Sequence, residues 1–230
     1  MSDELTWNAE AGRVDRVNRI QCGSVVLEES RAPAPPSEEA SRLLLRAAEG
    51  RPLAGHDALE GLRARIALVR AKCPELGLDE PPDNAALLAR ACEGLTRLSE
   101  LEGVDLAALL RAELPAARRL SELAPERVTL PGGRSTAVHY EAGKPPWIAS
   151  RLQDFFGMGD TPRICDGREP LTLHLLAPNQ RAVQVTSDLS GFWERHYPSI
   201  RRELMRRYPK HAWPEDGRNA KPPAPRGRRR

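Results

Sequence analysis

The chain has 230 residues, of which 40% are hydrophobic and 29% charged, a composition typical of a soluble globular protein with one large or two small domains. No apolar run approaches the roughly 20 residues that a transmembrane helix needs. Residues 1–4 are acidic and no apolar stretch follows them, which argues against a secretory signal. We therefore expect a cytoplasmic protein with no membrane partner. The cysteines form no C-x-x-C pair and are expected to be buried, reduced thiols: Cys22, Cys73, Cys92 and Cys165.

Charge and aromatic residues are divided unevenly along the chain. Residues 192–230 contain twelve Lys or Arg against four acids, a net charge of +8, whereas the first 191 residues carry a net charge of −5. Nine of the ten aromatic residues follow residue 139. A basic, aromatic end on a slightly acidic body indicates a polyanionic partner. A solvated terminal helix with an unstructured tail explains the same composition equally well.

Residues 1–30 predict a three-stranded meander, because β-branched residues at 14–20 and 25–27 alternate with glycine turns. A meander of this size is marginally stable by itself. We therefore expect its removal to leave the stability of the remainder nearly unchanged. Three prolines in residues 31–36 predict a stiff linker after the strands.

Residues 37–125 predict a small helical bundle built from leucine and alanine. Leucines recur at intervals of three and four, the spacing of one apolar helix face, and we interpret these stripes as core. Four polar residues stand where helix N-caps are expected: Ser37, Asp57, Asp83 and Asp105.

Residues 126–216 predict a mixed α/β domain. Gly132 and Gly133 are expected in a hairpin turn, and short alternating strands follow. Asp188 is expected to cap a helix that Pro198 must kink or restart. Residues 217–230 contain no apolar residue except alanine, so we expect a disordered basic tail. The fold class expected for the whole chain is α+β.

The sequence contains none of the common catalytic motifs. It has no G-x-x-x-x-G-K-[ST] phosphate loop, no G-x-G-x-x-G and no H-E-x-x-H. A G-x-S-x-G nucleophile elbow is also missing. We therefore predict no catalytic residue, no metal site and no cofactor in this chain.

The candidate site is a basic, aromatic stretch near the C-terminus. Guanidinium groups one helical turn apart match successive phosphates along a strand, and exposed aromatic rings beside them can stack on bases. A second interpretation places Trp193 and Leu204 on the inner face of this helix and leaves the arginines solvated. The candidate nucleic-acid-binding residues are Arg201, Arg202, Arg206, Arg207, Tyr208, Lys210 and Trp213.

Four segments carry a family resemblance. Residues 151–158 and 161–164 read RLQDFFGM and TPRI, which resemble the "RLQELFGL…TPRI" segment of HrpB-type ATP-dependent helicases of the DEAH/RHA group. Residues 173–178 and 182–193 are similar to the "LHLLSP" and "RPVQVTxDLxGFW" segments of that bacterial family. Residues 208–216 read YPKHAWPED, which differs from the family's closing "RYPKHPWPED" by alanine in place of proline at position 212. A looser likeness extends over residues 5–216.

This resemblance implies the C-terminal piece of a helicase. Such helicases carry two RecA-like domains with a phosphate loop and a DExH box, and neither motif occurs here. ATP and Mg²⁺ are therefore expected only in a helicase core outside this sequence, so we expect no ATPase activity from this chain alone. Residues 1–30 resemble the last strands of the family's OB-like part, as an incomplete OB-like meander.

The expected function is that of a helicase accessory module. Its expected partners are RNA or single-stranded nucleic acid and the helicase core domains. Two other functions fit the sequence: a protein-interaction module in which the C-terminal aromatic residues dock on another domain, and a small stand-alone nucleic-acid-binding protein.

Overall fold

Strands and helices occur in separate runs along the computed structural model, which describes residues 2–22, 25–51, 55–114 and 117–224. This mixture confirms the predicted α+β class. Contacts divide the chain into two compact units. Unit 1 is Met1–Glu60 with Asp79–Pro115, and unit 2 is Gly61–Leu78 with Ala116–Arg230. The helical residues at 37–125 therefore contribute to both units. The predicted division into 1–30, 37–125, 126–216 and 217–230 remains a prediction based on element type.

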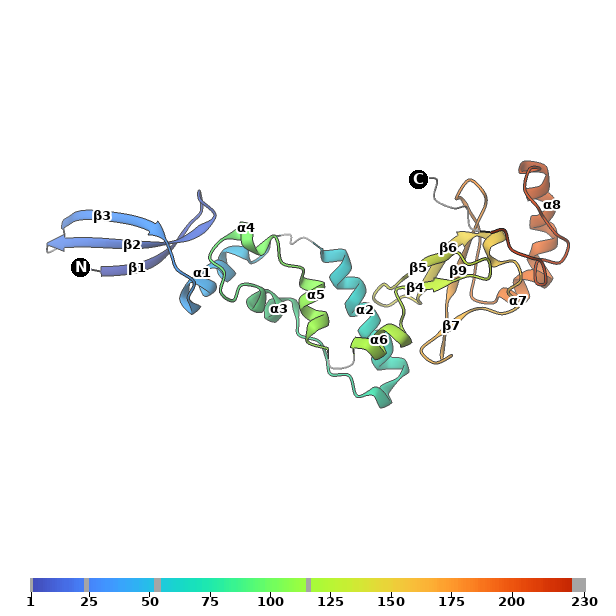
Figure 1. Ribbon diagram of the computed structural model, residues 1–230, viewed down its shortest axis with the longest axis horizontal. Helices are drawn as coiled ribbons and strands as arrows, with labels where there is room; N and C mark the ends of the chain where they lie inside the picture. The colour runs from blue at the N-terminus through green and yellow to red at the C-terminus, as the bar shows by residue number, and fades with distance from the viewer. Residues whose placement is uncertain (1, 23–24, 52–54, 115–116, 225–230) are drawn as a thin grey trace. The chain divides into compact units, whose positions relative to one another are not determined.

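The first element of unit 1 is an antiparallel meander with strand order β1-β2-β3, drawn in blue in Figure 1. Its strands are β1 (Ser2–Asn8), β2 (Arg13–Cys22) and β3 (Val25–Pro33). The backbone N–H of Val14 donates to the carbonyl of Thr96 at 2.9 Å, and the N–H of Leu98 donates to the carbonyl of Gly12 at 3.0 Å. Val14 and Val17 are 0% and 1% exposed. These contacts argue against the expectation that the meander is dispensable, because β2 contributes to the core of unit 1.

The helices of unit 1 begin at three of the predicted N-caps. Ser37, Asp83 and Asp105 each accept a backbone N–H three residues ahead, at 3.1, 2.7 and 2.9 Å. Asp57 instead lies inside the first turn of its helix, where the helix dipole stabilises its negative charge. The helices that begin in unit 1 are α1 (Glu38–Ala48), α2 (His56–Lys72), α3 (Asn84–Ala91), α4 (Leu98–Leu101) and α5 (Leu106–Ala112).

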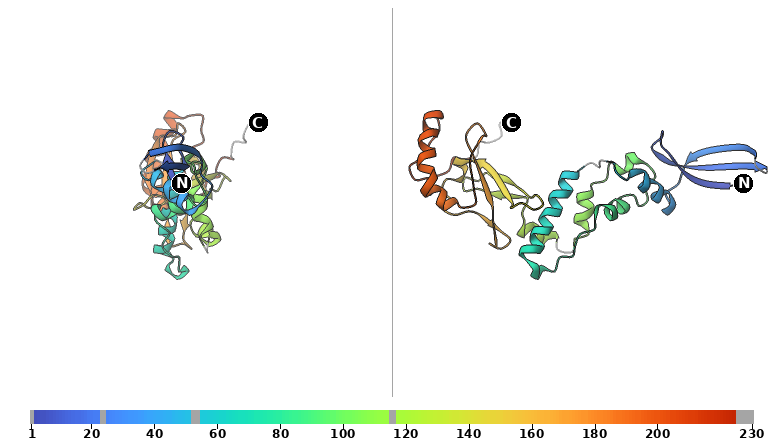
Figure 2. Two further views of the ribbon diagram at one scale, coloured as in Figure 1. Left: turned by 90° about the vertical axis from the view of Figure 1, so that its left-hand side faces the viewer. Right: turned by 180° about the vertical axis from the view of Figure 1, so that it is seen from behind.

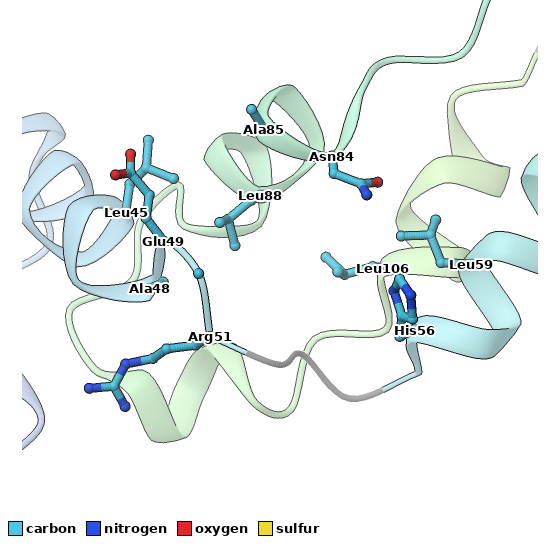
Figure 3. Close-up of a pocket in the computed structure, with 11 residues that line it drawn as sticks. Leu45, Ala48, Glu49, Arg51, His56, Leu59, Asn84, Ala85, Leu88 and Leu106 are labelled. Atoms are coloured by element: carbon cyan, nitrogen blue, oxygen red, sulfur yellow. The ribbon is translucent and has the colours of Figure 1, made fainter.

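A hollow of about 680 Å³ opens among α1, α3, α5 and the start of α2. Leu59, Leu88 and Leu106 converge on it, whereas the guanidinium of Arg51 points away (Figure 3). Its wall combines leucines and alanines with the polar residues Glu49, His56 and Asn84.

Unit 2 is built on a five-stranded sheet with strand order β10-β9-β6-β5-β4. The pair β6–β9 is parallel, and the other neighbouring pairs are antiparallel. Burial alternates along β6 and β9, so that Ile148, Leu173 and Leu175 face the core. The strands are β4 (Arg127–Thr129), β5 (Ser135–His139), β6 (Trp147–Arg151), β9 (Thr172–Leu176) and β10 (Ala182–Thr186), with a separate ribbon of β7 (Arg163–Ile164) and β8 (Glu169–Pro170).

Unit 2 contains two further short helical elements before the sheet. The 3₁₀ turn η1 (Pro74–Leu76) follows α2, and α6 (Ala117–Leu123) leads into β4. A second 3₁₀ turn, η2 (Leu152–Phe155), follows β6 and is buried throughout.

The last helix restarts at the predicted proline. Asp188 caps α7 (Leu189–Gly191), a π-helical turn η3 (Phe192–His196) follows, and α8 (Tyr197–Arg207) has Pro198 in its first turn. Proline is tolerated there because the first N–H groups of a helix have no intrahelical partner. Figures 1 and 2 both show α8 beside the sheet of unit 2.

Residues 217–224, which we call the C-terminal strap, differ from the expected disordered tail. The N–H of Gly157 donates to the carbonyl of Gly217 at 3.1 Å, and Gly217 itself is buried against Trp193. A Cβ at Gly217 would lie 2.6 Å from the Trp193 ring, so this approach requires glycine. The rest of the predicted tail, residues 225–230, lies outside the described residues.

Candidate nucleic-acid interface

Helix α8 carries three exposed arginines. Arg202, Arg206 and Arg207 are exposed, and we call them the α8 face. Arg202 and Arg206 are four residues apart, which places them on the same side about 6 Å apart along the axis. Within the described residues, no carboxylate forms an ion pair with any of the three. Their charges are therefore available to an anionic partner.

The opposite side of α8 is structural. Tyr197 and Leu204 are 1% and 4% exposed and pack into unit 2. The Tyr197 hydroxyl donates to the carbonyl of Pro214 at 2.8 Å. Burial of this side chain raises its pKa to about 12. This placement agrees with the interpretation in which the inner face of the helix is core.

Two predicted site residues have a different role. Arg201 Nε donates to the carbonyl of Trp213 at 2.8 Å, and its side chain is only 21% exposed. Trp213 is 7% exposed, and its indole N–H donates to the carbonyl of Tyr208 at 3.1 Å. Arg201 is thus committed to the backbone, and Trp213 has no free face on which a base could stack. We remove both from the candidate set.

Three side chains together fix the segment after α8. Gln153 Nε2 donates to the carbonyl of Ala212 at 2.9 Å, next to the carbonyls of Trp213 and Pro214 that accept from Arg201 and Tyr197. Three successive carbonyls are therefore held by side-chain donors from η2 and α8. This clamp fixes the segment that carries Lys210, which is exposed.

Tyr208 lies between the helix and this segment. It is half-buried, and the Arg207 guanidinium lies 5.8 Å from its ring centroid, within cation–π range. Only part of its ring is accessible, and Arg207 occupies one side of it.

Sequence reasoning missed a stack of three rings on the half-exposed face of the sheet. The rings of His139 and Trp147 are 3.9 Å apart and those of Trp147 and His174 are 4.5 Å apart, both nearly parallel. The three residues come from the neighbouring strands β5, β6 and β9. Alternation along β6 and β9 predicts the face of each ring, but the cross-strand register that aligns them is a tertiary property.

The described residues contain neither a metal-binding cluster nor a membrane-spanning helix. Their His, Cys, Asp and Glu side chains form no group of three or more that could hold a metal ion. Within the same residues, we find no helix whose length and apolar content would carry it across a bilayer.

Comparison with known proteins gives a consistent result. Residues 87–217 match the family described as ATP-dependent helicase C-terminal, of HrpB type. The ATP-dependent RNA helicase HrpB of Escherichia coli (strain K12) is 32% identical over 96% of this chain, which spans 29% of that protein.

Two crystal structures of the Escherichia coli protein have the same fold. The structure of the DExH-box NTPase HrpB matches with a TM-score of 0.75 at 32% identity, over 96% of this chain and 29% of that one. The structure of the DEAH/RHA helicase HrpB matches with a TM-score of 0.64 at 31% identity, over 92% and 28%. The chain spans less than a third of these relatives. It belongs to the HrpB-type family of ATP-dependent helicase C-terminal regions.

Proposed function

We propose that this chain is an accessory module that binds single-stranded RNA for an HrpB-type helicase, with the α8 face as the contact. The observation that supports this proposal is the row of exposed arginines without ion-pair partners among the described residues. The name of the Escherichia coli relative, an RNA helicase, indicates the kind of nucleic acid. Arginines that reach phosphates bind with little regard to base sequence.

The same proposal places ATP hydrolysis in the helicase core and the module in the cytoplasm. ATP and Mg²⁺ would act in the helicase core, because this chain contains no phosphate loop. The module would act in the cytoplasm, where its four free cysteines suit a reducing compartment.

Salt dependence of RNA binding tests the proposal. Each phosphate contact on a single strand contributes about 0.7 to the log–log salt slope. The three arginines of the α8 face should therefore contribute about −2.1, and changing Arg206 and Arg207 to Ala should remove about 1.4 of it. The measurement is fluorescence anisotropy of a labelled oligouridine at several salt concentrations.

A matched control removes two other exposed charges from the same unit. Arg118→Ala with Lys144→Ala should leave the slope unchanged, because Arg118 lies on α6 and Lys144 in the turn between β5 and β6, where each pairs with a glutamate. Both double variants should melt like the parent, since exposed substitutions change stability by less than about 0.5 kcal/mol. If removal of residues 225–230 abolishes binding while the Arg206–Arg207 change has no effect, the α8 face is not the contact.

A second function, packing on the helicase core, is favoured by an apolar surface on the meander. Ile20, Val26 and Leu27 are 43%, 46% and 65% exposed on β2 and β3. Large apolar side chains exposed on neighbouring strands are typical of interaction surfaces. Val26→Asp with Leu27→Asp should abolish co-purification with the separately expressed remainder of an HrpB helicase. Retained co-purification would exclude this surface as the contact.

A further inference from the structure

A second basic surface lies in unit 2, next to the clamped segment. A groove of about 700 Å³ is bounded by η2, residues 210–214 and the C-terminal strap. Its volume falls within the roughly 300–1,000 Å³ of small-molecule sites. Arg151, Lys210 and Lys221 line it together with His211, and none of the described residues lining it is acidic.

The charge beside this groove is positive even after pairing. Asp154 is 3% exposed and accepts from Arg151 at 3.1 Å, while Arg134 lies 3.5 Å from the same carboxylate. Two guanidiniums thus share one carboxylate. Lys210 and Lys221 are exposed, and no carboxylate among the described residues pairs with either of them. Of the charged residues that line the groove, Lys210 and Lys221 thus have no carboxylate partner among the described residues, and Arg151 shares its partner with Arg134.

The strap forms one wall of the groove and is held against glycines. A Cβ on Gly132 would lie 2.8 Å from the carbonyl oxygen of Pro223, and one on Gly157 would lie 3.0 Å from that of Ala220. Such contacts with backbone atoms require the chain to shift. The close approach of the strap, which places Lys221 among the residues that line the groove, therefore depends on glycine at these positions.

We propose that this groove binds phosphates of a single-stranded RNA through Lys210 and Lys221, as a second contact beyond the α8 face. The inference rests on the proposed function for the identity of the partner. The aromatic floor consists of Phe156 and Trp213, which are 2% and 7% exposed. Because these rings offer no open face on which a base could stack, we expect the groove to bind phosphates without regard to base sequence.

Two charge changes test the groove directly in the full chain. With five contacts, the salt slope of RNA binding should be about −3.5, so affinity falls about 130-fold between 50 and 200 mM salt. Lys210→Ala with Lys221→Ala should reduce the slope to about −2.1 and the fall to about 20-fold. The control Arg118→Ala with Lys144→Ala removes as much charge elsewhere and should keep the parent slope.

A charge-neutral change tests the geometry. Gly132→Ala should displace the strap at Pro223 and reduce the slope by about 0.7, as Lys221→Ala alone does. Gly61→Ala is the matched control, because a Cβ at Gly61 meets no atom within 4 Å. It should leave RNA binding unchanged.

The outcomes separate this inference from the proposed function. If RNA does not bind the parent chain, the proposed function fails and the groove with it. If the Arg206–Arg207 change lowers the slope but the Lys210–Lys221 change does not, only the groove is refuted. Equal losses in the Lys210–Lys221 and Arg118–Lys144 variants would show a general charge effect and refute it as well. Displacement of the RNA by equimolar AMP would show a mononucleotide site in place of a strand contact.

Discussion

Replacing Arg65 of α2 should lower the free energy of unfolding of unit 2. It is 4% exposed, and its Nε donates to the carbonyl of Ala124 at 2.9 Å. A second guanidinium nitrogen lies 2.7 Å from Glu126, and the group lies 5.7 Å from the Tyr140 ring centroid. Arg65 thereby joins α2 to the chain entering the sheet. We predict that Arg65→Met, which keeps the length of the apolar stem, destabilises unit 2.

The expected loss is about 3 kcal/mol. Ala124 is fully buried, so its carbonyl would lose a charged donor, which costs roughly 1.5–3 kcal/mol. Loss of the cation–π contact adds about 1 kcal/mol. The ion pair contributes little, because Glu126 is 65% exposed and returns to water. Glu126→Gln is therefore the matched control and should cost less than about 1 kcal/mol.

Urea unfolding followed by tryptophan fluorescence measures this difference. Trp147, Trp193 and Trp213 lie in unit 2 and only Trp7 lies in unit 1, so the signal reports mainly on unit 2. If Arg65→Met costs less than about 1 kcal/mol, the buried carbonyl contact is not a major contribution. If Glu126→Gln costs as much as Arg65→Met, the ion pair dominates and the reasoning from exposure is wrong.

Four further predictions follow from the same structure. Deletion of residues 1–33 should unfold unit 1, seen as lost helical circular dichroism, because β2 contributes Val14 and Val17 to its core. Cys22 is exposed, which corrects the expectation that all four thiols are buried, so under native conditions a thiol reagent should modify Cys22 at once and the three buried cysteines only after denaturation. Burial raises the pKa of Cys165 and of Tyr197 to about 12 each, so the folded chain keeps protons that the unfolded chain releases. Stability should therefore be complete below about pH 9 and fall as the pH rises towards 12, measured as the urea midpoint. Purified chain should hydrolyse no ATP with or without RNA, and RNA-stimulated phosphate release would contradict this.

Local patterns predicted the elements better than their grouping. The caps at Ser37, Asp83 and Asp105 and the restart at Pro198 depend on hydrogen bonds and sterics within a few residues. The attachment of α2 to the sheet through Arg65 depends on a partner 59 residues away. Periodicity within one helix or strand cannot predict a contact between residues so far apart in the sequence.

The candidate site shows the same limit. Residue type predicted the exposed arginines of the α8 face but could not distinguish them from Arg201, which is only 21% exposed and lies 3.6 Å from the carboxylate of Glu215. Lys221 was assigned to a disordered tail because low apolar content predicts disorder. Its place beside the groove results from close backbone approach at glycines, which composition does not reveal.

The segments that identify the family encode the fold more than the contact with a partner. In RLQDFFGM, Gln153 clamps the carbonyl of Ala212 and four neighbouring residues, Leu152, Asp154, Phe155 and Phe156, are buried. In GFW, Phe192 and Trp193 are buried, and in YPKHAWPED the tryptophan is buried as well. Surface residues whose only role is to meet a solvated phosphate need charge and not a particular order, because a guanidinium or ammonium reaches phosphate from many backbone positions. The family segments therefore identify the buried residues of the clamp that holds the segment with Lys210. The proposed RNA contacts are identified instead by the exposed charges on α8 and along the groove.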